Sequence, residues 1–192
     1  MPIAFQFDPE KFTQAAVYVT SRCPARMTKK KLFKLLYLAD REHLFRYARP
    51  ILKDRYINMD QGPVPSGSYD LVKANLRRWP QSVIDQFSRH IEVRGMQIVL
   101  REPAGVDLLS KSDTAVLDEI VDRYGARSAD YLSALSHRHV AWLQSQRNRP
   151  IDYVLFFADN PEVEYMRELV EHNQPIRDIP KNARVQSQPP TA

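Results

Sequence analysis

The sequence predicts a single α+β domain that is predominantly α-helical, with a buried central helix surrounded by other helices and a small antiparallel sheet of about three strands. Three observations support this class. The segment after Thr28 is apolar on nearly every side of a helix, residues 56–60 and 91–100 alternate with a period of two, and other apolar residues recur at helical spacing. A helix of that kind belongs in the interior, so we expect the other elements to pack around it.

The central helix is expected to begin after Thr28, whose side chain can cap it, and to end at Pro50. Its apolar residues form one stripe and fill much of the remaining surface: Leu32, Leu35, Leu36, Ala39, Phe33, Tyr37, Leu44 and Phe45. Lysines at positions 29–31 occupy its first turn, where the helix dipole disfavours cations. We interpret them as a solvated basic corner, with a landing point for an acidic partner as the alternative.

Two short segments carry the strand signal. Polar and apolar residues alternate around Tyr56, which predicts a half-buried strand. Residues 62–66 read Gly-Pro-Val-Pro-Ser and are expected to form a stiff turn, because each proline fixes its own φ and extends the residue before it. Residues 91–100 are predicted to form a β-hairpin that can pair with the strand near Tyr56.

The remaining helices are predicted from cap residues followed by apolar residues at helical spacing. The helix after the proline-rich turn is expected to be capped by Ser66 or Ser68 and to reach Arg77 or Arg78. Further helices are expected after Asp8, after Pro80, after Ser110 with Asp113 completing a capping box, after Ser128 and after Asn160. The apolar run at residues 151–158 fits a strand or a helix.

The length and composition of the chain favour one domain over residues 1–172. Residues 173–192 contain four prolines and few apolar side chains, so we expect them to be a flexible C-terminal tail. Cys23 is alone, which excludes an intrachain disulfide, and no segment approaches 18 uncharged apolar residues. We therefore expect a cytoplasmic protein without a membrane partner. The formal net charge of +5 favours acidic partners but does not distinguish nucleic acid from protein.

Several polar residues are candidates for catalysis or metal binding. Asp40 and His43 share one face of the central helix, which suits a general acid/base pair, two metal ligands, or a hydrogen-bonded pair. We favour hydrogen bonding, in which the two residues satisfy each other or a nearby backbone group, because an unpaired buried polar group costs about 1–3 kcal/mol. His137 and His139 would lie on nearly opposite sides of a helix, and no phosphate-binding loop is present. We expect no metal and no cofactor.

The segment from Lys34 to Val72, KLLYLADREHLFRYARPILKDRYINMDQGPVPSGSYDLV, resembles the signature of the Panacea domain, an antitoxin-associated family that includes the SocA-type proteolytic adaptor. The matching positions are Lys34, Leu35, Leu36, Tyr37, Asp40, His43, Tyr56, Gly62, Pro63, Pro65, Ser66 and Tyr69. A second, looser motif of the family is similar to Leu135, Ser136 and His137 with Trp142. The sequence departs from the pattern at His139, where the family leads us to expect an acidic residue, and the basic tail is not part of the pattern.

The resemblance implies a small, mostly helical domain without enzyme activity that neutralises a protein toxin encoded nearby. SocA-type members present the toxin to a ClpXP-type protease, and other members neutralise by binding. The expected partner-binding or motif residues are Lys34, Tyr37, Asp40, His43, Tyr56, Gly62, Pro63, Pro65, Ser66, Tyr69, His137 and Trp142. We further expect Asp40, His43 and His137 to form one internal polar cluster. The alternatives are a DNA-binding regulator, suggested by the positive charge, and a metal-dependent hydrolase that uses those three residues.

Overall fold

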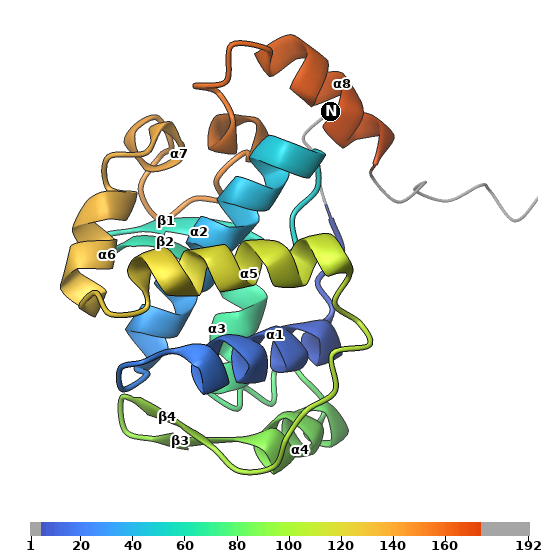
Figure 1. Ribbon diagram of the computed structural model, residues 1–192, viewed down its shortest axis with the longest axis vertical. Coiled ribbons are helices and arrows are strands. Elements are labelled where there is room, and N and C mark those ends of the chain that lie inside the picture. Colours follow the sequence, from blue (N-terminus) through green and yellow to red (C-terminus); the bar gives the residue numbers. More distant parts are fainter. Residues whose placement is uncertain (1–4, 174–192) are drawn as a thin grey trace, which may run out of the picture.

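A computed structural model describes residues 5–173 of the chain (Figure 1). Over this range the elements are, in order, α1 (Pro9–Arg22), α2 (Lys29–Tyr47), β1 (Tyr56–Met59), β2 (Gly62–Pro65), α3 (Ser66–Val72), α4 (Gln81–His90), β3 (Ile91–Arg94), β4 (Gln97–Leu100), α5 (Lys111–Tyr124), α6 (Ala129–Ser136), α7 (Val140–Leu143), the 3-10 helix η1 (Tyr153–Phe156) and α8 (Val163–His172). The predicted class, α+β and mostly helical, is confirmed. Of the predicted tail at residues 173–192, all but Asn173 lies outside the described residues. None of the described helices is long and apolar enough to cross a bilayer.

Helix α2 runs through the centre of the molecule, as predicted. Helix α5 lies across it, and α1, α6 and β2 also pack against it (Figure 1). Its stripe of Leu32, Leu35 and Leu36 is completely buried. The Thr28 hydroxyl accepts a hydrogen bond from the Lys31 amide, which confirms the predicted cap. The helix therefore starts where the sequence indicates and forms the core on which the other elements pack.

The first turn of α2 is only partly a solvated basic corner. Lys31 is 4% exposed, and its Nζ donates a hydrogen bond to the Gly125 carbonyl at 2.5 Å. For Lys31 the prediction of a solvated side chain is wrong, because this lysine satisfies a carbonyl at the end of α5. Lys30 lies at the surface, where its Nζ is 2.8 Å from a carboxylate oxygen of Asp130.

The segment at 62–66, predicted to be a turn, is mostly a strand. β1 and β2 form an antiparallel hairpin whose register runs from Tyr56 opposite Pro65 to Met59 opposite Gly62. The turn itself consists of the two residues between the strands, Asp60 and Gln61. The two prolines among these four residues argued against predicting a strand, because proline lacks the backbone amide hydrogen that normally bonds to the neighbouring strand.

The register explains how the prolines are tolerated. Tyr56 and Asn58, which lie opposite Pro65 and Pro63, direct their backbone groups away from β2. The Asn58 amide donates to the Arg149 carbonyl at 3.0 Å, and the Tyr56 carbonyl accepts from the Ile151 amide at 2.9 Å. The prolines therefore occupy positions at which no amide of β2 is needed for pairing.

The expected pairing between the hairpin at 91–100 and the strand near Tyr56 is wrong. β3 and β4 form their own two-stranded sheet, separate from β1–β2. That hairpin instead meets the start of α2, where the Lys29 amide donates to the Met96 carbonyl at 2.9 Å and the Ile98 amide donates to the Met27 carbonyl at 3.1 Å. Over residues 5–173 the sheet content is thus two hairpins, each fixed to a different neighbour.

Asp54, and not Ser66 or Ser68, supplies the polar cap of α3. Its carboxylate accepts hydrogen bonds from the amides of Gly67 and Ser68, each at 2.8 Å, and from the Ser68 hydroxyl at 2.7 Å. Pro65 occupies the N-cap position of α3, and its side chain makes no capping hydrogen bond. The helix also ends at Val72, earlier than the predicted Arg77 or Arg78.

Asp40 holds the chain that follows α2 against the helix. One carboxylate oxygen accepts from the amides of Ile51 and Leu52, at 2.8 and 2.9 Å, and the other accepts from the Tyr56 hydroxyl at 2.8 Å. Asp40 is completely buried. A single carboxylate therefore fixes the loop between α2 and β1 and the first residue of the β1–β2 hairpin.

We expect Asp40→Ala to lower the free energy of unfolding by about 4 kcal/mol, because it leaves three buried donors without an acceptor at roughly 1–3 kcal/mol each. Chemical denaturation followed by circular dichroism measures this loss. Asp130→Ala is the matched control, since the Asp130 side chain is 91% exposed. Asp40→Asn keeps one acceptor oxygen and should fall between the two. Equal stabilities of Asp40→Ala and Asp130→Ala would contradict the assigned role.

Candidate functional site

Four of the predicted site residues lie along α2, and each has a different partner. Lys34 contacts β2, Tyr37 contacts His139, Asp40 contacts the loop before β1, and His43 contacts the start of α5. These contacts are spread over about 13 Å of the helix axis, at 1.5 Å per residue. The side chains of α2 therefore join several elements and do not converge on one point.

The predicted polar cluster of Asp40, His43 and His137 is wrong. His137 follows α6 and stacks on Trp142, with the ring centroids 4.1 Å apart. Burial lowers the pKa of His137, and the charge of Lys34 lowers it further. Because Lys34 lies in the first half of α2, His137 is near the opposite end of the helix from His43. Helical spacing placed Asp40 and His43 on one face, but it carried no information about where α6 would end.

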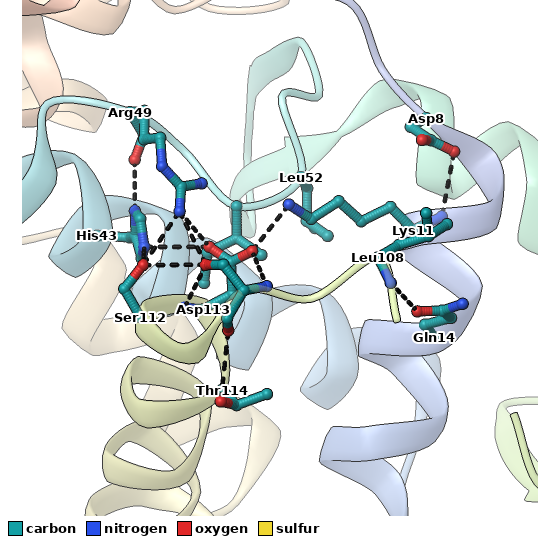
Figure 2. Close-up of polar contacts among 12 residues, drawn as sticks. Asp8, Lys11, Gln14, His43, Arg49, Leu52, Leu108, Ser112, Asp113 and Thr114 are labelled. Atoms are coloured by element: carbon teal, nitrogen blue, oxygen red, sulfur yellow. Dashed lines mark hydrogen bonds and ion pairs between the residues drawn. The ribbon is translucent and has the colours of Figure 1, made fainter. Parts of the chain in front are cut away.

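His43 belongs to a separate network around Asp113 (Figure 2). Its Nδ1 lies 2.7 Å from the Arg49 carbonyl, and because a carbonyl only accepts, Nδ1 carries the hydrogen. Its Nε2 lies 3.1 Å from both the Ser112 hydroxyl and an oxygen of Asp113. His43 thus joins α2 to the first turn of α5.

Asp113 is the centre of this network. Lys11 Nζ lies 2.8 Å from one carboxylate oxygen, and Arg49 lies 3.0 Å from the other (Figure 2). Burial by itself would raise the pKa of Asp113, but the close contact with His43 and the hydrogen bonds from Lys11 and the Ser110 amide outweigh burial and hold the pKa well below its usual range. The predicted capping box of Ser110 and Asp113 is confirmed. The network connects α1, α2 and α5 around a side chain without solvent exposure, which is a structural role.

The Asp40 carboxylate is likewise internal. Burial raises its pKa to about 6, opposed by the hydrogen bonds from Leu52, Tyr56 and Ile51. Above that pH the group is ionised and can accept all three. Tyr56 is 1% exposed, so Asp40, His43 and Tyr56 reach no surface of the folded domain. Their position favours the hydrogen-bonding interpretation over catalysis.

Tyr37 pairs with a residue at which the sequence departs from the family pattern. Its hydroxyl lies 3.1 Å from Nδ1 of His139, and the two rings stack with centroids 5.7 Å apart. Burial lowers the pKa of His139 to about 4, with Arg41 contributing in the same direction. At neutral pH the imidazole is therefore uncharged and suited to an apolar contact. A neutral histidine thus occupies the place at which an acid was expected.

Trp142 fixes α7 to the β1–β2 hairpin. Its indole nitrogen donates to the Met59 carbonyl at 3.0 Å, and its own carbonyl accepts from the Asn58 amide side chain at 3.0 Å. The tryptophan of the second motif is thereby connected to the end of β1. The two predicted motifs meet at this hairpin.

Lys34 is a buried lysine behind β2. It is 2% exposed, and its Nζ donates to the Pro63 carbonyl at 2.7 Å. Burial lowers its pKa to about 7, and the nearby charge of Lys30 contributes. Gly62 lies against it with φ of +92°, so that a Cβ at this position would come within 2.8 Å of Lys34 Nζ and would also collide with the Ser136 hydroxyl. Lys34, Gly62 and Pro63 together hold β2 close to α2.

A surface groove opens beside this contact. Its volume is about 250 Å³, and it lies between the first turns of α2, β2, α3 and the β3–β4 turn. The residues that line it are Lys29, Lys30, Phe33, Lys34, Gln61, Val64, Tyr69, Val72, Lys73 and Met96. Tyr69 is 38% exposed and Met96 is 61% exposed. The groove, which we call the lysine groove, is the candidate functional site because it combines accessible apolar surface with unbalanced positive charge.

Only two of the predicted site residues, Lys34 and Tyr69, line the lysine groove. Gly62, Pro63 and Pro65 are buried in the hairpin, and Ser66 begins α3. Met96 and Val64 were not among the predicted site residues, because their proximity depends on how two separate hairpins dock. Lys29 and Lys30 were signalled by their unfavourable place at the start of α2.

A metal site has no support in the described part of the chain. Residues 5–173 contain no group of three or more His, Cys, Asp or Glu side chains arranged to hold an ion. Asp40, His43 and His137 also have separate partners, so the arrangement required by a hydrolase that uses all three is absent from these residues.

Comparison with known proteins gives one match. The family described as "Antitoxin SocA-like, Panacea domain" matches residues 32–143, which is more than half of the 192-residue chain. No curated protein and no solved structure matches the chain. The matched range runs from the first turns of α2 through α7, and it includes the two hairpins and most of the lysine groove.

The burial of Lys34 predicts a dependence of stability on pH. Its pKa is about 7 in the folded chain against an ordinary 10.5, so the unfolded chain binds more protons between these values. The free energy of unfolding should therefore rise with pH, by about 2 kcal/mol between pH 7 and 9. Denaturation at several pH values should show this rise in the wild type and in Lys30→Met, but not in Lys34→Met. The same rise in Lys34→Met would contradict the assignment.

The contact at Gly62 predicts a large effect of adding one methyl group. Gly62→Ala should lower the free energy of unfolding by about 3 kcal/mol, through positive-φ strain of roughly 1–2 kcal/mol and displacement of packed neighbours. Gly95→Ala is the control, because Gly95 also has a positive φ, of +60°, but no atom lies within 4 Å of its added Cβ. Thermal and chemical denaturation compare the two. Equal losses would mean that crowding at Gly62 is unimportant.

Proposed function

We propose that this chain, which belongs to the SocA-like antitoxin family with a Panacea domain, neutralises a protein toxin encoded by an adjacent gene through direct binding. The family match over residues 32–143 is the observation on which this proposal rests. We place the function in the cytoplasm and assign the chain no enzymatic step of its own. Residues 1–172 act as the single binding domain in this proposal.

The structure supports a binding role because it offers a firm surface. The β1–β2 hairpin is held from α2 by Lys34 and Asp40, and from α7 by Trp142. A surface that is ordered before binding loses less conformational entropy when a partner docks. The polar network around Asp113 and the Asp40 contacts are internal, so their residues position the binding surface and do not form it.

Delivery of the bound toxin to a ClpXP-type protease is a second step of the proposal. The family description names a SocA-like antitoxin, and an adaptor of that type would have to present the toxin and the protease with separate surfaces. Simple neutralisation needs only the toxin surface. The two modes therefore differ in whether neutralisation depends on the protease.

DNA binding remains the alternative suggested by the net charge of +5. The burial of α2 argues against DNA binding through this helix. Helix α2, whose first turn carries the lysines, is buried from Lys31 to Asp40 and cannot enter a major groove as a recognition helix. Binding to a partner protein uses the exposed end of the same turn without removing the helix from the core.

Coexpression with the adjacent open reading frame tests the proposal. We expect the neighbouring gene alone to arrest growth of the host and the wild-type chain to restore it, because the toxin is bound. A chain that stops before Lys29, which lacks the whole matched region, is the negative control. A harmless neighbour, or a toxic one that the wild type does not rescue, would refute the antitoxin function. The same coexpression in a host without ClpX distinguishes the modes: rescue that persists indicates binding alone, and rescue that disappears indicates delivery.

A further inference from the structure

The lysine groove has the size of a side-chain pocket. Its volume of about 250 Å³ is below the roughly 300–1,000 Å³ of small-molecule and cofactor sites. Phe33 and Tyr69 line it as an aromatic pair, with ring centroids 6.1 Å apart and planes inclined by 48°. Val64 and Val72 extend the apolar lining. A groove of this size and composition suits one apolar or aromatic side chain that projects from a partner.

The charge of the lysine groove is entirely positive. Four lysines line it, at positions 29, 30, 34 and 73, and none of its lining residues is acidic. Within residues 5–173, Lys29 and Lys73 form no ion pair, and Lys73 Nζ lies 4.6 Å from the centre of the Tyr69 ring. Among the same described residues Lys30 pairs only with the exposed Asp130, and an exposed pair contributes about 0–1 kcal/mol. A carboxylate from a partner can therefore displace Asp130 at little cost.

Charge also decides between possible occupants. Residues 174–192 of this chain carry Arg177, Lys181 and Arg184 against one acid, Asp178, so this segment has the same sign as the groove. A second copy of the chain has a net charge of +5 and would likewise be repelled on average. Neither the chain's own tail nor a second copy complements the groove. An acidic protein partner does.

We propose that the lysine groove binds an acidic segment of the toxin, with one aromatic or aliphatic side chain packed against Phe33 and Tyr69 and carboxylates on Lys29 and Lys73. This inference rests on the proposed antitoxin function and specifies the surface and the partner's chemistry. The apolar side chain provides burial at the centre, and the lysines accelerate and orient docking from the rim. Lys34, whose amine is bound to Pro63, supports the groove from behind.

Charge reversal at the rim tests the inference. The double variant Lys29→Glu/Lys73→Glu changes two exposed or half-exposed side chains, and glutamate in the first turn of α2 is favoured by the helix dipole. The matched control, Lys111→Glu/Arg138→Glu, makes the same change in net charge at two exposed residues outside the groove. The probe is the purified product of the adjacent open reading frame, with affinity measured by titration calorimetry and neutralisation by growth rescue.

Lys29→Glu/Lys73→Glu, which we call the rim variant, should bind the probe about tenfold or more weakly and should lose rescue. The control Lys111→Glu/Arg138→Glu should keep an affinity within about twofold of the wild type. Wild-type affinity should fall as salt rises, and it should fall less in the rim variant. Tyr69→Ala should also weaken binding, with Tyr131→Ala, a comparably exposed tyrosine on α6, as its control. Circular dichroism and melting temperatures confirm that each variant is folded.

The outcomes separate this inference from the proposed function. If the wild type binds and rescues, and the rim variant does so equally well, the toxin uses another surface and the groove assignment is overturned while the antitoxin function stands. A rim variant that is impaired only as much as the control has the same meaning. If the wild type neither binds nor rescues, the proposed function fails and the groove assignment fails with it.

Discussion

The Asp40 carboxylate is the constraint on which the architecture around the candidate site depends. It lies in the middle of the buried helix α2 and receives hydrogen bonds from Ile51, Leu52 and Tyr56, which fixes the direction in which the chain leaves the helix. Burial of a charge is costly unless donors surround it, and here three donors offset part of that cost. Because Tyr56 begins β1, the position of the β1–β2 hairpin follows from this contact. The hairpin in turn carries Val64, which lines the lysine groove, and leads directly into α3, which carries Tyr69.

The second determinant is the contact between Lys34 and β2. A buried amine that donates to the Pro63 carbonyl, with Gly62 leaving no room for a side chain, holds the strand close to α2. The β3–β4 hairpin is fixed independently by backbone hydrogen bonds to Met27 and Lys29. The lysine groove therefore lies between parts that are each attached to the same end of α2. A site built on such supports keeps its shape without a ligand, which suits recognition of another protein.

Several errors in the sequence interpretation share one physical cause. Prolines at 63 and 65 argued against a strand, yet the register places them where the amides are not used. Ser66 and Ser68 were suitable cap residues by type, but Asp54, twelve or more residues earlier in the chain, reaches the same amides with a full carboxylate. His137 was assigned to a cluster with Asp40 and His43, although it lies near Lys34. Each outcome depends on how separate elements dock against one another, which residue type and spacing along the chain do not specify.

The sequence by itself determined the mostly helical class, the buried central helix with its Thr28 cap, the capping box at Ser110, and the resemblance to the antitoxin family. These follow from periodicity, local hydrogen bonding and a motif that is contiguous along the chain. The tertiary structure alone decided which polar residues pair, that β2 pairs with β1 in a hairpin separate from the predicted one at 91–100, and that Lys29, Tyr69, Lys73 and Met96 surround one groove. Pairing between remote segments depends on how helices and hairpins dock, and no local pattern of residues specifies that geometry.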